Sequence, residues 1–165
     1  MRLSKIEATF SNEDVQLAFH AGCQKLKEKK PEIFSVVDVS SLDVTGAYLY
    51  LKGSVKNDGS WYGFTAKLDL IPSKDNAGIG VKLVDFSMDG WAVRFLLGCK
   101  ALFGDKTEVF VMKKIRDAAG SALDIDVDAC VIWINLKEKL ATVGSEIGAV
   151  SGVYVGGSSI IIQVG

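Results

Sequence analysis

The sequence has few of the residues on which disulfide bonding, metal binding and nucleophilic catalysis depend. Its 165 residues include only three cysteines and one histidine. The cysteines, Cys23, Cys99 and Cys130, are odd in number, lie far apart and sit in apolar stretches. They form neither a disulfide framework nor a metal-ligand spacing, and free cysteines of this kind indicate a reducing compartment.

The single histidine, His20, argues against nucleophilic catalysis. A nucleophile, base and acid would have to be His20, a cysteine or serine, and an orienting carboxylate, and none of these has a local signature. We therefore predict no catalytic residue and no enzymatic activity. An enzyme acting on acyl groups or carbohydrates would need paired polar groups in a cavity, and the sequence shows no convincing pair.

The chain also lacks an excess of charge of either sign. Nineteen Lys and Arg residues against 20 Asp and Glu residues leave a net charge of -1, so no global field attracts nucleic acid or an anionic membrane. The longest basic run, Lys25 to Lys30, ends a predicted helix, where cations complement the helix dipole. That interpretation is favoured over a phosphate site. No glycine-rich phosphate-binding motif is present, so we predict no nucleic-acid partner and no cofactor.

Long hydrophobic runs are missing as well. No segment approaches about 18 uninterrupted apolar residues, the length expected of a transmembrane helix, and the N-terminus lacks the apolar stretch of about 7–15 residues that a signal peptide requires. We therefore expect no transmembrane segment and, for the chain as it stands, a cytoplasmic location. A removed export signal is the alternative, and peripheral contact with a membrane stays open.

Apolar residues are nevertheless abundant. They make up 48% of the chain, the mean hydropathy is +0.25, and 17 glycines punctuate the sequence. A chain of this length can bury about 70% of the surface that it exposes when unfolded. We predict one domain over residues 1–165 with a substantial core.

The first predicted element is a helix over residues 12–30. Ser11, followed three residues later by Asp14, resembles a capping box, and Pro31 cannot continue the helix. Between them, apolar or small residues recur at helical spacing and define one face: Val15, Ala18, Phe19, Gly22, Cys23 and Leu26.

From Glu32 to Met88 the period changes to two, which is typical of antiparallel strands. We expect a bend near Ser40 and Ser41, unbroken alternation from Val44 to Leu51, a hairpin turn over residues 57–60, a second turn over residues 72–78, and a strand over residues 79–88. One face of the strand that follows the hairpin turn is apolar: Tyr62, Phe64, Ala66, Leu68 and Leu70.

Helical spacing returns between Trp91 and Gly120, as two consecutive helices or one helix broken at Gly104, with Thr107 starting the second. A strand pattern then runs from Leu123 to Ile134, and residues 150–155 and 160–164 predict a C-terminal hairpin. Strand runs separated by helices favour an α+β fold with one antiparallel sheet and helices on one face.

A row of carboxylates is the sharpest polar pattern. Period two would place Asp124, Asp126 and Asp128 on one face of a strand, and oxygen ligands suit calcium or magnesium. Residues two apart on a strand are, however, separated by about 7 Å, too far for all three to meet on one ion. A solvated strand face is favoured, and we predict no metal site.

The order of elements and several local patterns resemble the tubular lipid-binding (TULIP) superfamily, and within it the small bacterial LmeA-like phospholipid-binding proteins. The resemblance rests on the capped helix at Ser11, the strand from Val44 to Leu49, the hairpin over residues 53–61, the strand over residues 64–70 before Pro72, and the strand pair about Gly157. It implies a curved antiparallel sheet wrapped around or packed on long helices, as in a TULIP-like half-barrel. It also implies an apolar groove for acyl chains and a binding role without catalysis.

The leading hypothesis is thus non-enzymatic binding of a lipid or other apolar small molecule in an elongated groove between helices and sheet. Residues on the predicted apolar faces are the candidates to line it: Phe19, Leu26, Phe64, Leu68, Phe95, Leu102 and Phe110. The alternative is a structural or assembly protein with a filled core. It would form homo-oligomers through an open sheet edge at Ile160 to Ile162.

Overall fold

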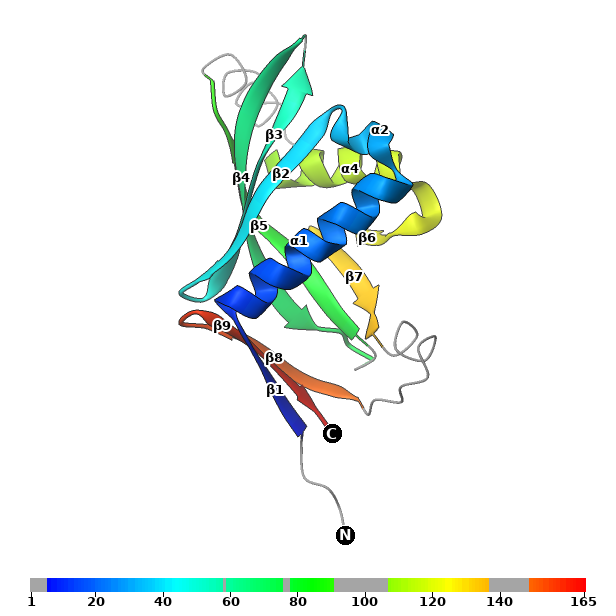
Figure 1. Ribbon diagram of the computed structural model, residues 1–165. Helices are drawn as coiled ribbons and strands as arrows, with labels where there is room; N and C mark the ends of the chain where they lie inside the picture. Colours follow the sequence, from blue (N-terminus) through cyan, green and yellow to red (C-terminus); the bar gives the residue numbers. More distant parts are fainter. Residues whose placement is uncertain (1–5, 58, 76–77, 91–106, 137–148) are drawn as a thin grey trace.

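The computed structural model describes residues 6–57, 59–75, 78–90, 107–136 and 149–165 (Figure 1). Over these ranges the chain is α+β, and every strand pair is antiparallel, which confirms the predicted class. A six-stranded sheet has the order β2-β3-β4-β5-β7-β6, and a three-stranded sheet has the order β1-β9-β8. The prediction of a single sheet is therefore wrong, because the pairing of strands far apart in sequence leaves no trace in local periodicity.

The bounds of the elements agree closely with the helices predicted over residues 12–30 and from Thr107 onward, and with most predicted strands. The helical segment predicted between Trp91 and Gly104 lies outside the described residues. The helices are α1 (Asn12–Lys29), α2 (Pro31–Phe34) and α4 (Thr107–Ala119), which the 3-10 helix η1 (Gly120–Ala122) follows. The strands of the large sheet are β2 (Val37–Thr45), β3 (Tyr48–Asn57), β4 (Ser60–Pro72), β5 (Gly78–Met88), β6 (Asp124–Asp126) and β7 (Val131–Asn135). Those of the small sheet are β1 (Ile6–Ser11), β8 (Val150–Gly156) and β9 (Ser159–Val164).

Helix α1 begins at the predicted capping box. The Ser11 hydroxyl accepts a hydrogen bond from the Asp14 backbone N–H at 3.2 Å, and the Asp14 carboxylate accepts one from the Ser11 N–H at 2.8 Å. Hydrogen bonds from the Ser11 hydroxyl, and then from its backbone, hold the pKa of Asp14 below its ordinary value. The helix ends at Lys29 as expected, but Pro31 opens the short helix α2 where alternation predicted a strand.

Helix α1 packs along the edge strand β2 without burying any residue completely. Val15, Phe19 and Cys23 are half-buried, whereas Leu17 is 65% exposed. At the start of the helix, the side-chain oxygen of Asn12 accepts a hydrogen bond from the Val44 N–H at 2.7 Å. The helix therefore satisfies part of an otherwise open sheet edge.

Replacing Gly22 with alanine is expected to stabilise the protein. This glycine is exposed in the middle of α1, and a Cβ there would meet nothing within 4 Å. Alanine restricts the unfolded chain and favours the helix, so the free energy of unfolding should rise by about 0.5–1 kcal/mol. Urea denaturation measures this change. Gly46→Ala, at a φ of +63°, should lower stability instead, and equal behaviour of the two variants would contradict the argument.

The alternation from Val44 to Leu51 is not one strand. The chain turns at Gly46 and Ala47, so that Thr45 pairs with Tyr48 and Val44 with Leu49. A two-residue turn reverses the parity of the alternation, which places Val44 and Leu49 on the same buried face. Only the isolated Gly46 marks this turn in the sequence. The predicted turn over residues 57–60 is confirmed by the pairing of Asn57 with Ser60.

The row of three aspartates is also broken by a turn. Asp124 and Asp126 are exposed on β6, but Asp128 lies in the turn that leads to β7. The Asp126 carboxylate accepts a hydrogen bond from the Ala129 N–H at 2.9 Å, and Cys130 adopts a φ of +56°. The prediction that all three lie on one strand face is therefore wrong. The Asp126 carboxylate continues the alternation of β6, but it also stabilises the turn that ends this strand.

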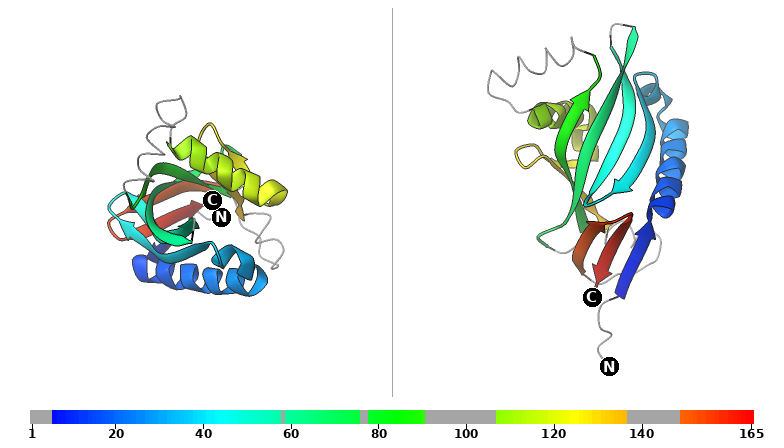
Figure 2. Two further views of the ribbon diagram at one scale, coloured as in Figure 1. Left: turned by 90° about the horizontal axis from the view of Figure 1, so that it is seen from above. Right: turned by 90° about the vertical axis from the view of Figure 1, so that its left-hand side faces the viewer.

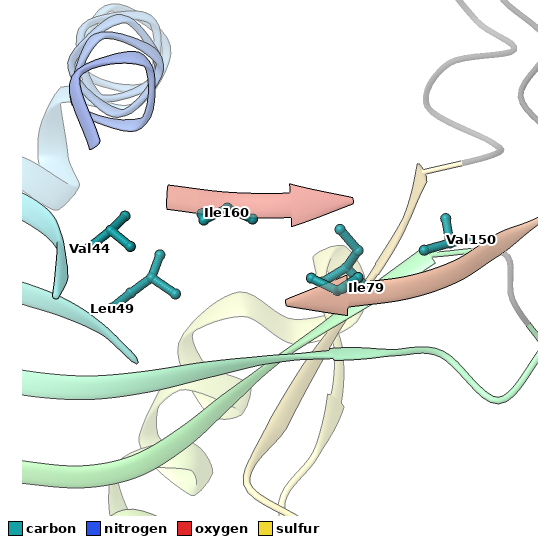
Figure 3. Packing of buried hydrophobic residues seen from close by; sticks show 6 residues of the cluster. Val44, Leu49, Ile79, Val150 and Ile160 are labelled. Atoms are coloured by element: carbon teal, nitrogen blue, oxygen red, sulfur yellow. The ribbon is translucent and has the colours of Figure 1, made fainter. Parts of the chain in front are cut away.

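Buried residues form two clusters. The first lies between the two sheets, where Figure 3 shows Val44, Leu49, Ile79, Val150 and Ile160 gathered from different strands. The second lies between the large sheet and α4 and includes Ala66, Leu83, Met112, Val127 and Cys130. Leu68 packs against both clusters and joins them.

Strand β9 lies inside the small sheet. It pairs with β1 on one side, where Ile160 faces Phe10, and with β8 on the other, where Ile160 faces Val155. The expectation of an open edge at Ile160 to Ile162 is therefore wrong. The pairing with β1 joins opposite ends of the sequence, which local patterns cannot reveal.

Candidate functional site

A large apolar cavity lies between the six-stranded sheet and α4. Its volume is about 950 Å³. In the view from above, α4 and α1 lie on opposite sides of the strands (Figure 2). The prediction of helices on one face of the sheet is therefore wrong, because helical periodicity does not show which surface a helix will cover. The described lining residues come from β2, β3, β4, β5, β7 and α4: Val37, Val39, Leu51, Val55, Lys56, Tyr62, Phe64, Ala66, Leu68, Val81, Leu83, Phe86, Met88, Phe110, Val111, Met112, Lys114, Ile115 and Ile132.

The part of the cavity wall that β4 forms follows from the alternation of side chains along a strand. Tyr62, Phe64, Ala66 and Leu68 line the cavity, while the residues between them project to the other face of the sheet. Antiparallel pairing then sets the neighbouring β3 residues beside them, because the turn over residues 57–60 fixes the register. Leu51 therefore pairs with Ala66.

Two β-bulges adjust which residues face the cavity. On β5, Leu83 pairs with Leu68 and Asp85 pairs with Lys67, so Val84 is an extra residue. This shift brings both Leu83 and Phe86 to the cavity although their spacing is odd. The Phe86 ring stacks on Phe64 at a centroid distance of 5.7 Å. The second bulge, at Ser40 on β2, confirms the predicted bend near Ser40 and Ser41.

Glycine makes room for an aromatic ring in this wall. Gly53 on β3 pairs with Phe64 on β4. A Cβ at Gly53 would lie 2.8 Å from the Phe64 ring and would also collide with the backbone oxygen of Asp38. The ring of Phe64 therefore occupies the space that a side chain at position 53 would need.

The cavity wall is almost entirely apolar. Among its described residues, Lys56 and Lys114 are the only charged side chains, and none is a carboxylate. Such a surface offers dispersion contacts and removal of apolar groups from water, with few polar anchors. It suits the binding of a molecule with a large apolar part.

The structure separates the seven candidate residues into three groups. Phe64, Leu68 and Phe110 line the cavity. Phe19 and Leu26 lie on α1, which contributes no described lining residue; Phe19 is half-buried, and Leu26 is 44% exposed. Phe95 and Leu102 lie outside the described residues.

Sequence reasoning missed several lining residues whose positions it could have supplied. Once the turn over residues 57–60 is placed, register counting pairs Leu51 with Ala66 and Val55 with Tyr62. Val111 and Ile115 lie four residues apart on α4, as one helical face requires. Phe86 and Met88 follow the bulge at Val84, for which the sequence has no signal.

A second, more polar groove lies near the other end of β4 and β5. Its volume is about 560 Å³, and its lining includes Asp75, Asp124, Asp126 and Trp133. Ser73 donates a hydrogen bond to the Asp75 carboxylate at 2.6 Å. Within the described ranges, no group of three or more His, Cys, Asp or Glu side chains could hold a metal ion.

Of the remaining candidate reactive groups that the structure describes, His20, Cys23 and Cys130, none lines the cavity. His20 is exposed on α1, with its ring 5.6 Å from that of Phe19. Cys23 is half-buried, and burial, followed by the nearby Asp38 carboxylate, raises the pKa of its thiol. Cys130 is buried, and Cys99 lies outside the described residues. Of the helices that the structure describes, none is long and apolar enough to cross a membrane.

The function of the cavity has to be inferred from its lining residues and its shape. Comparisons of the chain with protein-family models, with curated proteins and with solved structures give no match.

Proposed function

We propose that this protein binds a lipid or another apolar small molecule, without catalysis, in the cavity between the six-stranded sheet and α4. The observation that carries the proposal is a cavity of about 950 Å³ with an apolar wall. Ligand sites in proteins typically have volumes of about 300–1,000 Å³. This cavity is at the upper end of that range, which suits a long or bulky ligand.

Burial of an acyl chain supplies enough free energy for such binding. Each methylene removed from water contributes about 0.8 kcal/mol, so eight methylenes contribute about 6 kcal/mol. The ligand's loss of translational and rotational freedom and the ordering of side chains oppose binding. A longer acyl chain in the same cavity makes the net free energy of binding more favourable.

The resemblance to the TULIP superfamily forms part of the same proposal. In that arrangement a curved antiparallel sheet and its helices enclose an apolar groove. An antiparallel sheet with an apolar cavity beneath α4 supports the comparison. Here the cavity adjoins α4, while α1 packs along β2.

The proposal predicts that a larger side chain inside the cavity weakens binding. Ala66 is 5% exposed and lies on β4 between Phe64 and Leu68. In Ala66→Phe a ring would project into the cavity, and we expect at least about tenfold weaker binding of the neutral apolar dye N-phenyl-1-naphthylamine, a loss of about 1.4 kcal/mol. Fluorescence titration measures the affinity.

The matched control is Ala21→Phe, which adds the same ring at an exposed position of α1. Its dye affinity should equal that of the wild type, and circular dichroism should show both variants folded. Organic extraction of gently purified protein, followed by mass spectrometry, should release an apolar molecule. A clean extract together with no dye binding by the wild type would refute the proposed function.

A further inference from the structure

The part of the cavity wall that the sheet forms has two chemically different regions. At the start of β4 and the end of β5 the lining side chains are aromatic or contain sulfur: Tyr62, Phe64, Phe86 and Met88. The other described lining residues of the sheet are aliphatic, apart from Lys56. Aromatic and aliphatic surfaces are therefore segregated on this wall rather than mixed.

Strand pairing brings the four aromatic or sulfur-containing residues together into one patch, which we call the aromatic patch. Phe64 pairs directly with Met88, and Ala66 pairs with Phe86. Directly paired residues of antiparallel strands have their side chains on the same face. Tyr62 precedes Phe64 by two residues and so shares that face. The patch is continuous across β4 and β5.

The ring of Phe64 lies along the sheet instead of standing upright on it. A Cβ at Gly53 on the neighbouring strand β3 would lie 2.8 Å from Cζ, the tip of this ring. An upright side chain would hold its tip far from position 53, because side chains in strands stand roughly perpendicular to the sheet. The ring therefore covers β3 with one face and leaves the other face toward the cavity.

The neighbouring ring of Phe86 extends this surface. The two rings are inclined by 22° to each other, and their centres are 5.7 Å apart. Since stacked carbon atoms are in contact at about 3.5–4 Å, the rings must be offset sideways by about 4 Å, and each covers only part of the other. All four residues of the aromatic patch are half-buried. The patch thus retains accessible ring surface on the cavity wall.

We propose that the ligand carries a planar aromatic ring, which stacks on the aromatic patch while an aliphatic part of the same molecule fills the rest of the cavity. This inference rests on the proposed function and narrows its ligand class. Offset aromatic rings attract each other beyond the effect of buried area, and the Met88 thioether adds a polarizable, adaptable contact. A saturated acyl chain would bury the same wall without the interaction between rings.

The test compares two alcohols with the same carbon skeleton, phenylhexanol and cyclohexylhexanol, both with the ring at the end opposite the hydroxyl group. Each competes with N-phenyl-1-naphthylamine for the protein. The dye is itself aromatic, so its affinity is measured separately for every variant. In Phe86→Leu the wall stays apolar but loses a ring, and the affinity ratio of phenylhexanol to cyclohexylhexanol should fall by about 2–10-fold. Phe64→Leu should shift the ratio in the same direction.

The matched control is Phe10→Leu, the same substitution on β1 at a residue that is 41% exposed and does not line the cavity. It should keep the wild-type ratio, and circular dichroism should show all three variants folded. An unchanged ratio in both cavity variants, with the alcohols still bound, would overturn the aromatic-ligand proposal and leave apolar binding intact. Failure of the dye and both alcohols to bind the wild type would overturn both proposals.

Discussion

Replacing Met112 with alanine is expected to lower the free energy of unfolding by about 2–5 kcal/mol. Met112 is 1% exposed and is the one residue of α4 that is fully buried among those whose burial is described. It packs in the cluster that joins α4 to Ala66 and Leu83 on the large sheet. The truncation removes this contact and leaves a void that the neighbouring strands fill only partly.

Urea denaturation monitored by tryptophan fluorescence measures the effect. Arg116→Ala on the same helix is the matched control, because the Arg116 side chain is 52% exposed and forms an ion pair at 4.0 Å with Asp117, which is more exposed still. An exposed pair of this kind contributes about 0–1 kcal/mol. Equal losses in the two variants would show that α4 is not anchored through Met112.

Replacing Gly78 with alanine should cost about 3 kcal/mol, at the upper end of the usual range for overpacked sites. Gly78 is buried at the start of β5 and pairs with Asn135 on β7. A Cβ at this position would collide with the backbone carbonyl oxygen of Ile134. A carbonyl in a paired strand cannot rotate away as a side chain can, so the strands themselves must separate.

The same movement would disturb the loop between β4 and β5. The Gly78 N–H donates a hydrogen bond to the Ser73 hydroxyl at 3.0 Å, and its carbonyl accepts one from the Ser73 N–H at 3.1 Å. Thermal unfolding of Gly78→Ala and Gly22→Ala compares the same substitution at two positions. We expect the unfolding temperature to fall in Gly78→Ala and to rise in Gly22→Ala. A Gly78→Ala protein as stable as the wild type would contradict the predicted collision.

Local patterns in the sequence were sufficient for elements whose cause is local. The Ser11 and Asp14 side chains place the start of α1, and alternation on β4 places Phe64 and Leu68 on the cavity wall. Helical spacing likewise identifies an apolar face that contains Phe19. It cannot say which surface that face will meet: α1 packs along β2, and Phe19 does not line the cavity.

Features that depend on contacts between residues far apart in the chain could not be predicted from local sequence patterns. The extra residue Val84 shifts the register of β5 because of its pairing with β4, not because of its neighbours in the chain. One of the two partners of β9 is β1, more than a hundred residues earlier. The cavity is of the same kind, since the lining residues of α4 meet those of β4 only when α4 packs on the sheet.

The pairing of β1 with β9 also determines the order in which the protein can be completed during synthesis. Every described lining residue of the cavity lies between Val37 and Ile132, whereas the small sheet needs Ile6 and Val164 together. Closing so long a loop is entropically costly and slow compared with pairing neighbouring strands. The cavity wall can therefore emerge from the ribosome and assemble before the strand pair that links the two ends of the described chain.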